Sequence, residues 1–354
     1  MMMFEFYGKK IESCSKEFFG LKVARLLGGS DLTIPVHVIH GHAPGPVLGI
    51  FAAIHGTEYY QNRILRRIVS EVEPDTIKGT ILAVPVANPP AFSHMTRQTP
   101  RPPEETVDFA NLNRVFPGKR LTPLFGSMEP SDVSLTMKMA QILTEEVVEK
   151  CTHVIDYHGQ MPGMALKKIL FNLDPESKEM ARVFGLGLLH DPPEEDISRG
   201  ALTTLTSYAS GLGIKGIVPE IGGGGHSEQF ERECERIGVR GTLNVMIYLG
   251  MMEGEILLPE KQFYFRNAPH VRAPAGGYLI SNMMPEDVGI GRQPREVRKD
   301  EVLGTLYNPY TLKEIEEIKS PAAGLLYACR ISGLVEAKSE VLAVADYKDS
   351  MWVE

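Results

Sequence analysis

The stretch Val47-Leu-Gly-Ile-Phe-Ala-Ala-Ile-His-Gly-Thr-Glu58 joins an almost unbroken apolar run to an imidazole and, three residues later, to a carboxylate. The run Val47–Ile54 follows the turn signal Pro44-Gly45-Pro46, and its lack of polar residues predicts a strand that is buried on both faces. In open α/β sheets, ligands bind beyond the carboxyl ends of the strands. We therefore expect His55 and Glu58 to lie at a functional edge of a sheet.

Imidazole nitrogen and carboxylate oxygen are both ligands that zinc favours, and catalytic zinc sites commonly combine two histidines with one glutamate. The stretch Cys151-Thr-His-Val-Ile-Asp-Tyr-His-Gly159 supplies a second histidine, His158, at the end of another apolar strand. Asp156 precedes it on the same face and could orient an imidazole. Taken alone, His55 and Glu58 fit the start of a helix equally well, because the helix dipole favours a carboxylate in the first turn. The second strand-end histidine favours the metal site.

The composition describes an ordinary globular protein. The chain has 354 residues, of which 43% are hydrophobic and 23% charged, and this length is typical of about two domains. A net charge of -8, without a basic cluster interleaved with aromatic residues, argues against a nucleic-acid partner.

The start of the chain lacks the order of a secretory signal, and no apolar run is long enough to span a membrane. We therefore expect a cytoplasmic protein with no membrane partner. The four cysteines are scattered without a Cys-x-x-Cys motif, which predicts buried, reduced thiols rather than disulfides or a thiolate zinc site.

Between about residue 32 and residue 250, apolar strand patterns alternate with helical patterns, which predicts an α/β fold with a mostly parallel mixed sheet covered by helices. The predicted strands are Ile34–His40, Val47–Ile54, Thr80–Val86, His153–Tyr157, Ile169–Leu173 and Gly216–Ile221. The predicted helices are Gln61–Ser70, where Ile64, Leu65, Ile68 and Val69 share a face, Asp132–Glu149 and Glu228–Tyr248.

After Gly250 the pattern changes to short apolar runs broken by glycine and proline. We therefore predict a catalytic α/β domain over residues 1–255 and a smaller β-sandwich-like, all-β domain over residues 256–354. The C-terminal strands are similar to those of biotinyl and lipoyl carrier domains, but no lysine flanked by methionines stands at a hairpin tip. We favour the interpretation that the C-terminal domain forms a wall or lid for the first domain.

A long connection precedes the predicted helix at residue 132 and carries three polar residues suited to binding anions. Long loops in compact domains are usually functional. Asn113 and Arg114 could hold a carboxylate, and Arg97 could stabilise an oxyanion. The alternative for any one of these arginines is a surface ion pair that contributes little.

The stretch Gly216-Ile-Val-Pro-Glu-Ile-Gly-Gly-Gly-Gly225 places one carboxylate at the end of an apolar strand, directly before four glycines. A carboxylate is costly there unless it is paired or functional, and glycines let a substrate approach the backbone closely. A phosphate-binding loop is disfavoured because the Gly-Lys-Ser/Thr sequence is absent. Glu220 is better interpreted as the general base for a metal-bound water.

With these pieces placed, the chain resembles the succinylglutamate desuccinylase/aspartoacylase family, itself similar to zinc carboxypeptidases, over most of its length. His55-Gly-Thr-Glu58 matches the family's ligand pair, and Asp156-Tyr-His158-Gly matches its third ligand. Asn111-Leu-Asn-Arg-Val-Phe-Pro-Gly118 is the family's signature intact, which implies that Asn113 and Arg114 hold a substrate carboxylate. Arg97 matches the family's oxyanion arginine and Glu220 its catalytic glutamate.

Two departures bear on the substrate. The segment Gln98–Asp108 is longer than in short members of the family, and the four glycines are typical of the bacterial N-acyl-diaminobutyrate deacetylase-like branch.

The resemblance implies a zinc-dependent deacylase, an amidohydrolase acting on linear amides, with one Zn²⁺ per chain on His55, Glu58 and His158. Its partner would be a small N-acyl amino acid or a similar carboxylate-bearing amide, and a homo-oligomer is compatible with the sequence. Two alternatives stay open: a metallocarboxypeptidase that acts on short peptides, and a non-catalytic zinc-containing binding module.

Overall fold

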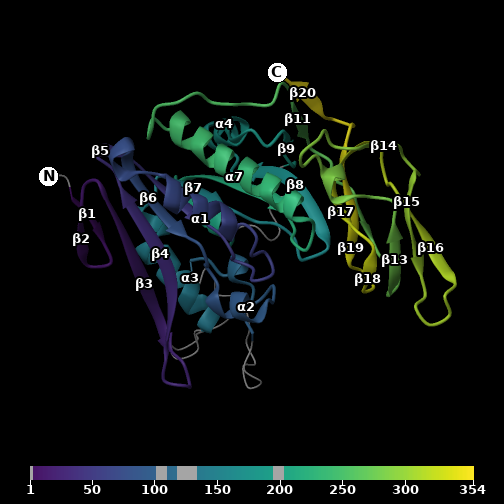
Figure 1. Cartoon of the computed structure of the whole chain (residues 1–354), viewed down its shortest axis with the longest axis horizontal. Coiled ribbons are helices and arrows are strands. Elements are labelled where there is room, and N and C mark those ends of the chain that lie inside the picture. Colours follow the sequence, from purple (N-terminus) through teal and green to yellow (C-terminus); the bar gives the residue numbers. More distant parts are fainter. Residues whose placement is uncertain (1–2, 101–109, 118–133, 194–202) are drawn as a thin grey trace.

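The computed structural model describes residues 3–100, 110–117, 134–193 and 203–354, and one large β-sheet runs through it (Figure 1). Ten strands form the main path of this sheet: β3 (Ser15–Arg25), β4 (Asp31–His40), β5 (Ala43–Phe51), β6 (Lys78–Val84), β7 (His153–Asp156), β8 (Met164–Phe171), β10 (Lys215–Gly222), β12 (His270–Arg272), β17 (Gly324–Arg330) and β19 (Glu340–Asp346). Their order is β12-β19-β17-β8-β10-β7-β5-β6-β4-β3. Strands β10, β7, β5 and β6 are parallel, and antiparallel strands flank them on both sides. The predicted mostly parallel mixed sheet is confirmed.

Strand β5 lies at the centre of this sheet and is buried on both faces, as its apolar sequence predicts. Leu48 and Ile50 belong to the hydrophobic core on one side of the sheet, and Phe51 belongs to the core on the other side. In the parallel pairing with β7, Leu48 lies opposite His153 and Phe51 opposite Asp156. Because the two strands end in register, the loops that follow them leave the sheet at the same edge.

Helices cover both faces of the sheet. Helices α1 (Asn62–Glu71), α4 (Pro175–Phe184) and α7 (Glu228–Tyr248) pack into one core, and α3 (Leu135–Glu146) and α6 (Leu205–Gly211) pack into the other. The three predicted helices are confirmed, although residues 132–133 of the second lie outside the described residues. Helix α7 begins where predicted because the Ser227 side chain caps it, accepting a hydrogen bond from the Phe230 amide.

Two features of the first domain differ from the predictions. Helix α1 begins at Asn62, so Glu58 lies in the preceding loop and the interpretation of His55 and Glu58 as a helix start is wrong. Strands β1 (Met3–Phe6), β2 (Lys9–Glu12) and β3 precede the region where strands were predicted. Strand β3 ends the main path of the sheet and mixes exposed with partly buried residues, so it lacks the continuous apolar run of a central strand.

The residues after α7 are all-β but divide between two sheets. Four antiparallel strands form a separate sheet: β13 (Gly277–Ser281), β15 (Val302–Tyr307), β16 (Glu314–Lys319) and β18 (Gly333–Val335). The others join the central sheet through the pairing of β17 with β8. Strand β14 (Glu296–Val297) pairs with β17. Strand β11 (Gln262–Phe265) pairs with β9 (Leu188–His190) and with β20 (Met351–Val353). The boundary near residue 255 therefore stays a prediction.

The cysteines follow the prediction with one exception. Cys151, Cys234 and Cys329 are buried free thiols, whereas Cys14 is exposed. Within the described ranges, no helix has the length and apolar character needed to cross a membrane.

Gly223, in the glycine run after Glu220, is explained by close packing of the chain against itself. A Cβ on Gly223 would lie 1.5 Å from the carbonyl oxygen of Met164 in β8. No such clash exists at Gly211 in α6, where a Cβ would meet nothing within 4 Å. The need for glycine at residue 223 thus comes from the neighbouring strand and does not require a substrate.

We predict that Gly223→Ala lowers the free energy of unfolding by about 1–3 kcal/mol or more, because the backbone must move to admit the methyl group. The matched variant Gly211→Ala should be neutral or slightly stabilising, since alanine is favoured over glycine in a helix. Urea unfolding of both variants measures the difference. Equal midpoints for the two would contradict the close approach at Gly223.

Candidate metal centre

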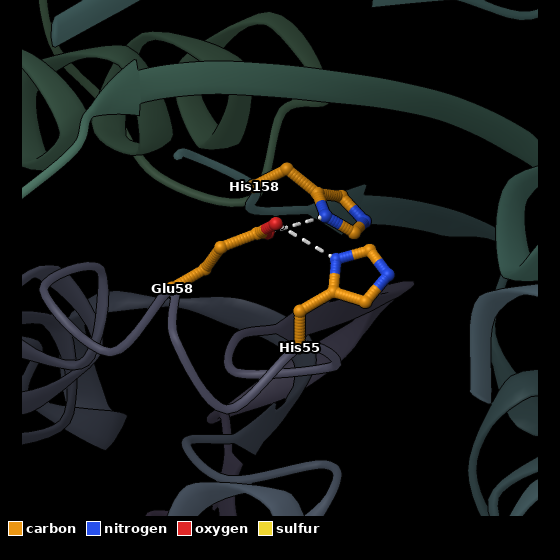
Figure 2. A group of neighbouring side chains, drawn as sticks. All are labelled: His55, Glu58 and His158. Carbon is orange, nitrogen blue, oxygen red and sulfur yellow. Dashed lines mark hydrogen bonds and ion pairs between the residues drawn. The ribbon is translucent and has the colours of Figure 1, made fainter. Parts of the chain in front are cut away.

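The three predicted metal ligands meet in one buried cluster. Figure 2 shows the carboxylate of Glu58 facing one nitrogen of each of the neighbouring rings of His55 and His158. One carboxylate oxygen lies 2.8 Å from Nδ1 of His55, and the other lies 2.8 Å from Nδ1 of His158. One ligand atom from each of the three residues falls within 4.8 Å of the others, and all three side chains are buried. This donor set is consistent with a single metal site.

The outer nitrogen of each ring faces an oxygen. Nε2 of His55 lies 3.1 Å from Oδ1 of Asn111, and Nε2 of His158 lies 3.1 Å from Oδ2 of Asp156. An oxygen acceptor favours the proton on Nε2, which leaves the Nδ1 lone pair free to bind a metal. The contact to Asp156 agrees with its predicted role in orienting an imidazole.

The charges in the cluster favour binding of a cation. Burial raises the pKa of Glu58, but the charges of His55 and His158 outweigh it and lower that pKa well below its usual value. Burial lowers the pKa of His158, but Asp156 and Glu58 raise it well above the usual value. Glu58 therefore stays ionised, and positive charge is stabilised beside it.

The loop after β5 is shaped by the helix packed against it. A Cβ on Gly56 would lie 2.1 Å from the backbone carbonyl of Ala91 in α2 (Pro89–His94), so only glycine fits at position 56, directly after the first ligand. The amide of Glu58 donates to the carbonyl oxygen of His55 at 3.0 Å, which closes a turn. This turn brings the carboxylate of Glu58 back onto the imidazole.

Glu220 lies next to His158 because β10 continues beside the end of β7. The amide of His158 donates to the carbonyl of Pro219, and the amide of Ile221 donates to the carbonyl of His158, each at 3.0 Å. Burial raises the pKa of Glu220, partly offset by the positive charges of Lys168 and His158. A carboxylate with a raised pKa beside a metal site can accept and return a proton.

A cavity of about 420 Å³ opens over the cluster and is lined by most of the predicted site residues, namely His55, Arg97, Asn113, Arg114, His158 and Glu220. Its remaining wall consists of Leu170, Phe171, Asn172, Leu173, Pro192, Thr204, Thr206, Ser207, Ser210 and Val218. Glu58 lies beneath this lining. No described residue after Glu220 lines the cavity, so the role of the C-terminal strands as wall or lid stays a prediction.

The polar residues of the long loop take different positions. Arg97 donates to Oε1 of Glu58 at 2.5 Å, and its side chain is 45% exposed at the cavity. Asn113 is buried: its Oδ1 accepts from the amide of Leu205 at 3.0 Å, and its Nδ2 lies 3.1 Å from Nε2 of His158. The Arg114 guanidinium donates to the carbonyl of Asn113 at 2.7 Å and lines the cavity. Residues 101–109 and Gly118 lie outside the described residues.

Sequence reasoning missed two residues near Glu220. Lys168 lies directly opposite Glu220 in the antiparallel pairing of β8 with β10. Its ammonium group lies 4.9 Å from the ring centroid of Tyr327, which is buried in β17. The lysine pair at residues 167–168, inside the apolar run of β8, is the signal that could have identified this position.

Comparison with known proteins agrees with this geometry. Residues 44–249 match the succinylglutamate desuccinylase/aspartoacylase catalytic domain, which is more than half of the chain. The chain belongs to this family.

Its similarity to individual members extends over almost all of its length. It is 24% identical, over 90% of its residues and 87% of the relative's, to N-alpha-acetyl-L-2,4-diaminobutyric acid deacetylase of Halomonas elongata.

Among solved structures, succinylglutamate desuccinylase/aspartoacylase from Rhodobacter sphaeroides and the product-bound ectoine utilization protein EutE (DoeB) from Ruegeria pomeroyi are both similar. Each has a TM-score of 0.74 at 21% identity, with 94% of this chain and 95% of the other covered. Thrombin activatable fibrinolysis inhibitor (TAFI) has a TM-score of 0.51 at 14% identity, over 67% of this chain and 69% of its own, which indicates a carboxypeptidase-like fold.

The contact between Asp156 and His158 gives a test of the metal centre. We predict that Asp156→Asn weakens zinc binding by about 10- to 100-fold, because the ring loses the charged acceptor that orients it. Competition with a chelator measures the affinity. Asp191→Asn, which removes a carboxylate paired with Lys178, is the control and should bind zinc like the unmodified protein. Equal affinities in all three proteins would contradict the role of Asp156.

Proposed function

We propose that this chain is a zinc-dependent hydrolase that cleaves the amide bond of an N-acyl amino acid or a similar small amide bearing a carboxylate. The observation that carries the proposal is the position of the cluster of His55, Glu58 and His158 at a cavity that Glu220 and two arginines also line. Membership of the succinylglutamate desuccinylase/aspartoacylase family supports hydrolysis of this kind.

The donor set fits zinc, since two imidazole nitrogens and one carboxylate oxygen are the ligands of many catalytic zinc sites with an open fourth position. A bound Zn²⁺ would supply a water of lowered pKa and polarise the acyl carbonyl.

Glu220 would move the protons. Its raised pKa lets it take a proton from the attacking water and later give that proton to the leaving amine. Arg97 would stabilise the oxyanion that develops on the carbonyl oxygen of the acyl group, since its guanidinium reaches the ligand cluster yet remains partly exposed at the cavity.

Arg114 is the residue we assign to the substrate carboxylate. It lines the same cavity as Arg97, and burial, followed by the charge of Arg97, lowers its pKa. Asn113 would contribute less directly, because both ends of its side-chain amide contact the protein. Its backbone carbonyl accepts a hydrogen bond from Arg114 and would help to hold that guanidinium in place.

The substrate is proposed by class. The relative from Halomonas elongata is named for N-acetyl-2,4-diaminobutyric acid, which makes that compound the first to test. Thr206, Ser207 and Ser210 give the cavity hydroxyl groups that could bind a polar amine-bearing side chain.

A panel of N-acyl amino acids, their carboxamides and short peptides, together with zinc analysis, tests the function. We expect zinc to copurify and the N-acyl amino acids to be hydrolysed in preference to their carboxamides. In Arg114→Gln this preference should fall by at least about tenfold, because a charge-assisted contact is lost. Cleavage of peptides alone would favour a carboxypeptidase, and bound zinc without any turnover would favour a binding module.

We predict that Glu220→Gln leaves the zinc content unchanged and lowers turnover by about 10²–10⁴-fold, because the amide cannot accept the proton. Metal analysis and steady-state kinetics on the same preparation measure both quantities. A variant with full activity would exclude Glu220 as the base.

A further inference from the structure

A second cavity, of about 620 Å³, lies on another side of the molecule and shares no lining residue with the metal-site cavity. It is bounded by α7, by the start of β9, and by the C-terminal loop that includes Gly289, Gly291 and Pro294. Lys167 of β8 lines it, whereas the next residue, Lys168, lies opposite Glu220. Side chains alternate between the faces of a strand, so the two lysines point to opposite sides of the sheet.

The second cavity is cationic in a chain whose net charge is -8. Its lining contains the cations Lys167, Arg236, Arg240, Lys261 and Arg292, and the anions Glu233 and Glu260. Arg236 is neutralised by a two-pronged contact to Glu233, at 2.8 and 2.5 Å, and Arg292 pairs with Asp287. Lys261 lies 4.0 Å from a carboxylate oxygen of Glu354. Of the five cations, Lys167 and Arg240 have no ion-pair partner among the described residues.

Lys167 is 9% exposed, and its ammonium group donates to the carbonyl oxygen of Gly289 at 2.7 Å. No described carboxylate lies within ion-pair distance of it. The Nε of Arg240 is buried and has no hydrogen-bond partner in the described part of the chain. Burial, followed by the charge of Arg240, lowers the pKa of Lys167 to about 8, with Cys234 and Glu233 acting in the opposite direction, and both cations line the same cavity.

Lys167 is buried with its ammonium group hydrogen-bonded to a carbonyl oxygen rather than to a carboxylate, and Arg240 has a buried Nε without a hydrogen-bond partner among the described residues. A bound anion would offset the cost of this lost hydration. We propose that the second cavity binds a small phosphate-bearing ligand, with its phosphate held between Lys167 and Arg240. A phosphate monoester carries about -1.5 to -2 charges at pH 7, which matches two cations, and the planar guanidinium suits its oxygens.

The rest of the second cavity fits an organic group attached to the phosphate. Leu188, Ile237, Pro259 and Trp352 give it an apolar side, and its volume exceeds that of the metal-site cavity. The ligand would contact α7 of the first domain and the loop at Gly289 of the C-terminal region together.

The position of Trp352 gives a specific readout, because it is the single tryptophan of the chain and it lines this cavity. The holoprotein is titrated with inorganic phosphate and with glycerol 3-phosphate at ionic strength held constant with chloride, and tryptophan emission is recorded. We expect a saturable change with both compounds. In Arg240→Gln the half-saturating concentration should rise at least about tenfold, since a charge-assisted contact is lost.

Three variants complete the experiment. Arg25→Gln removes an exposed arginine from β3, at the far end of the central sheet, and should respond like the unmodified protein. Phosphate could also enter the metal-site cavity, so Arg97→Gln must keep the tryptophan response if the second cavity is the site. Lys167→Met removes the buried charge while keeping an apolar side chain, and it should weaken the response even if Arg240→Gln does not fold.

The proposal is overturned if chloride alone produces the same change as phosphate. It is also overturned if neither phosphate compound changes the emission, or if folded Arg240→Gln or Lys167→Met responds like the unmodified protein.

Discussion

The buried carboxylate of Glu58 is the constraint on which the site depends. It is 3% exposed and lies between two imidazoles, each 2.8 Å from one of its oxygens. A lone carboxylate at that depth would be strongly destabilising, so the cluster holds together only if His55 and His158 arrive at the same place. Strands β5 and β7 deliver them, because the two strands are parallel, adjacent and in register as far as the pair Phe51 and Asp156, from which short segments lead to the two histidines.

The residues around the cluster hold the two imidazole rings in place. Asp156 and Asn111 hold the far sides of the two rings, and Asn113 accepts a hydrogen bond from the amide of Leu205 beside them. Glu220 belongs to β10, which pairs with β7 on the side opposite to β5. His158 and Glu220 are thus held at or beside strand ends, and positioned groups of this kind are what catalysis requires.

Much of the fold and the site could be predicted because their signals are local. The apolar runs of β5, β7 and β10 are readable as buried strands, and α7 was predicted with the bounds that the structure has. The strands β1 to β3 were missed because an edge strand needs no continuous apolar run. The division of the C-terminal strands between two sheets was also beyond the sequence, because the pairing of β17 with β8 joins residues far apart in the chain.

The sequence by itself determined which chemistry is available: two histidines and a glutamate at strand ends, a further carboxylate before a glycine run, and arginines in a long loop. Only the tertiary structure decided how each is used. It placed Lys168 opposite Glu220, engaged both ends of the Asn113 amide with the protein, and showed that Gly223 makes room for Met164. It also placed Lys167 and Arg240 in the lining of one cavity, with the Nε of Arg240 buried and without a hydrogen-bond partner among the described residues. The physical reason is that residue type sets what a side chain can bond, whereas burial and the partners within reach depend on contacts between distant segments.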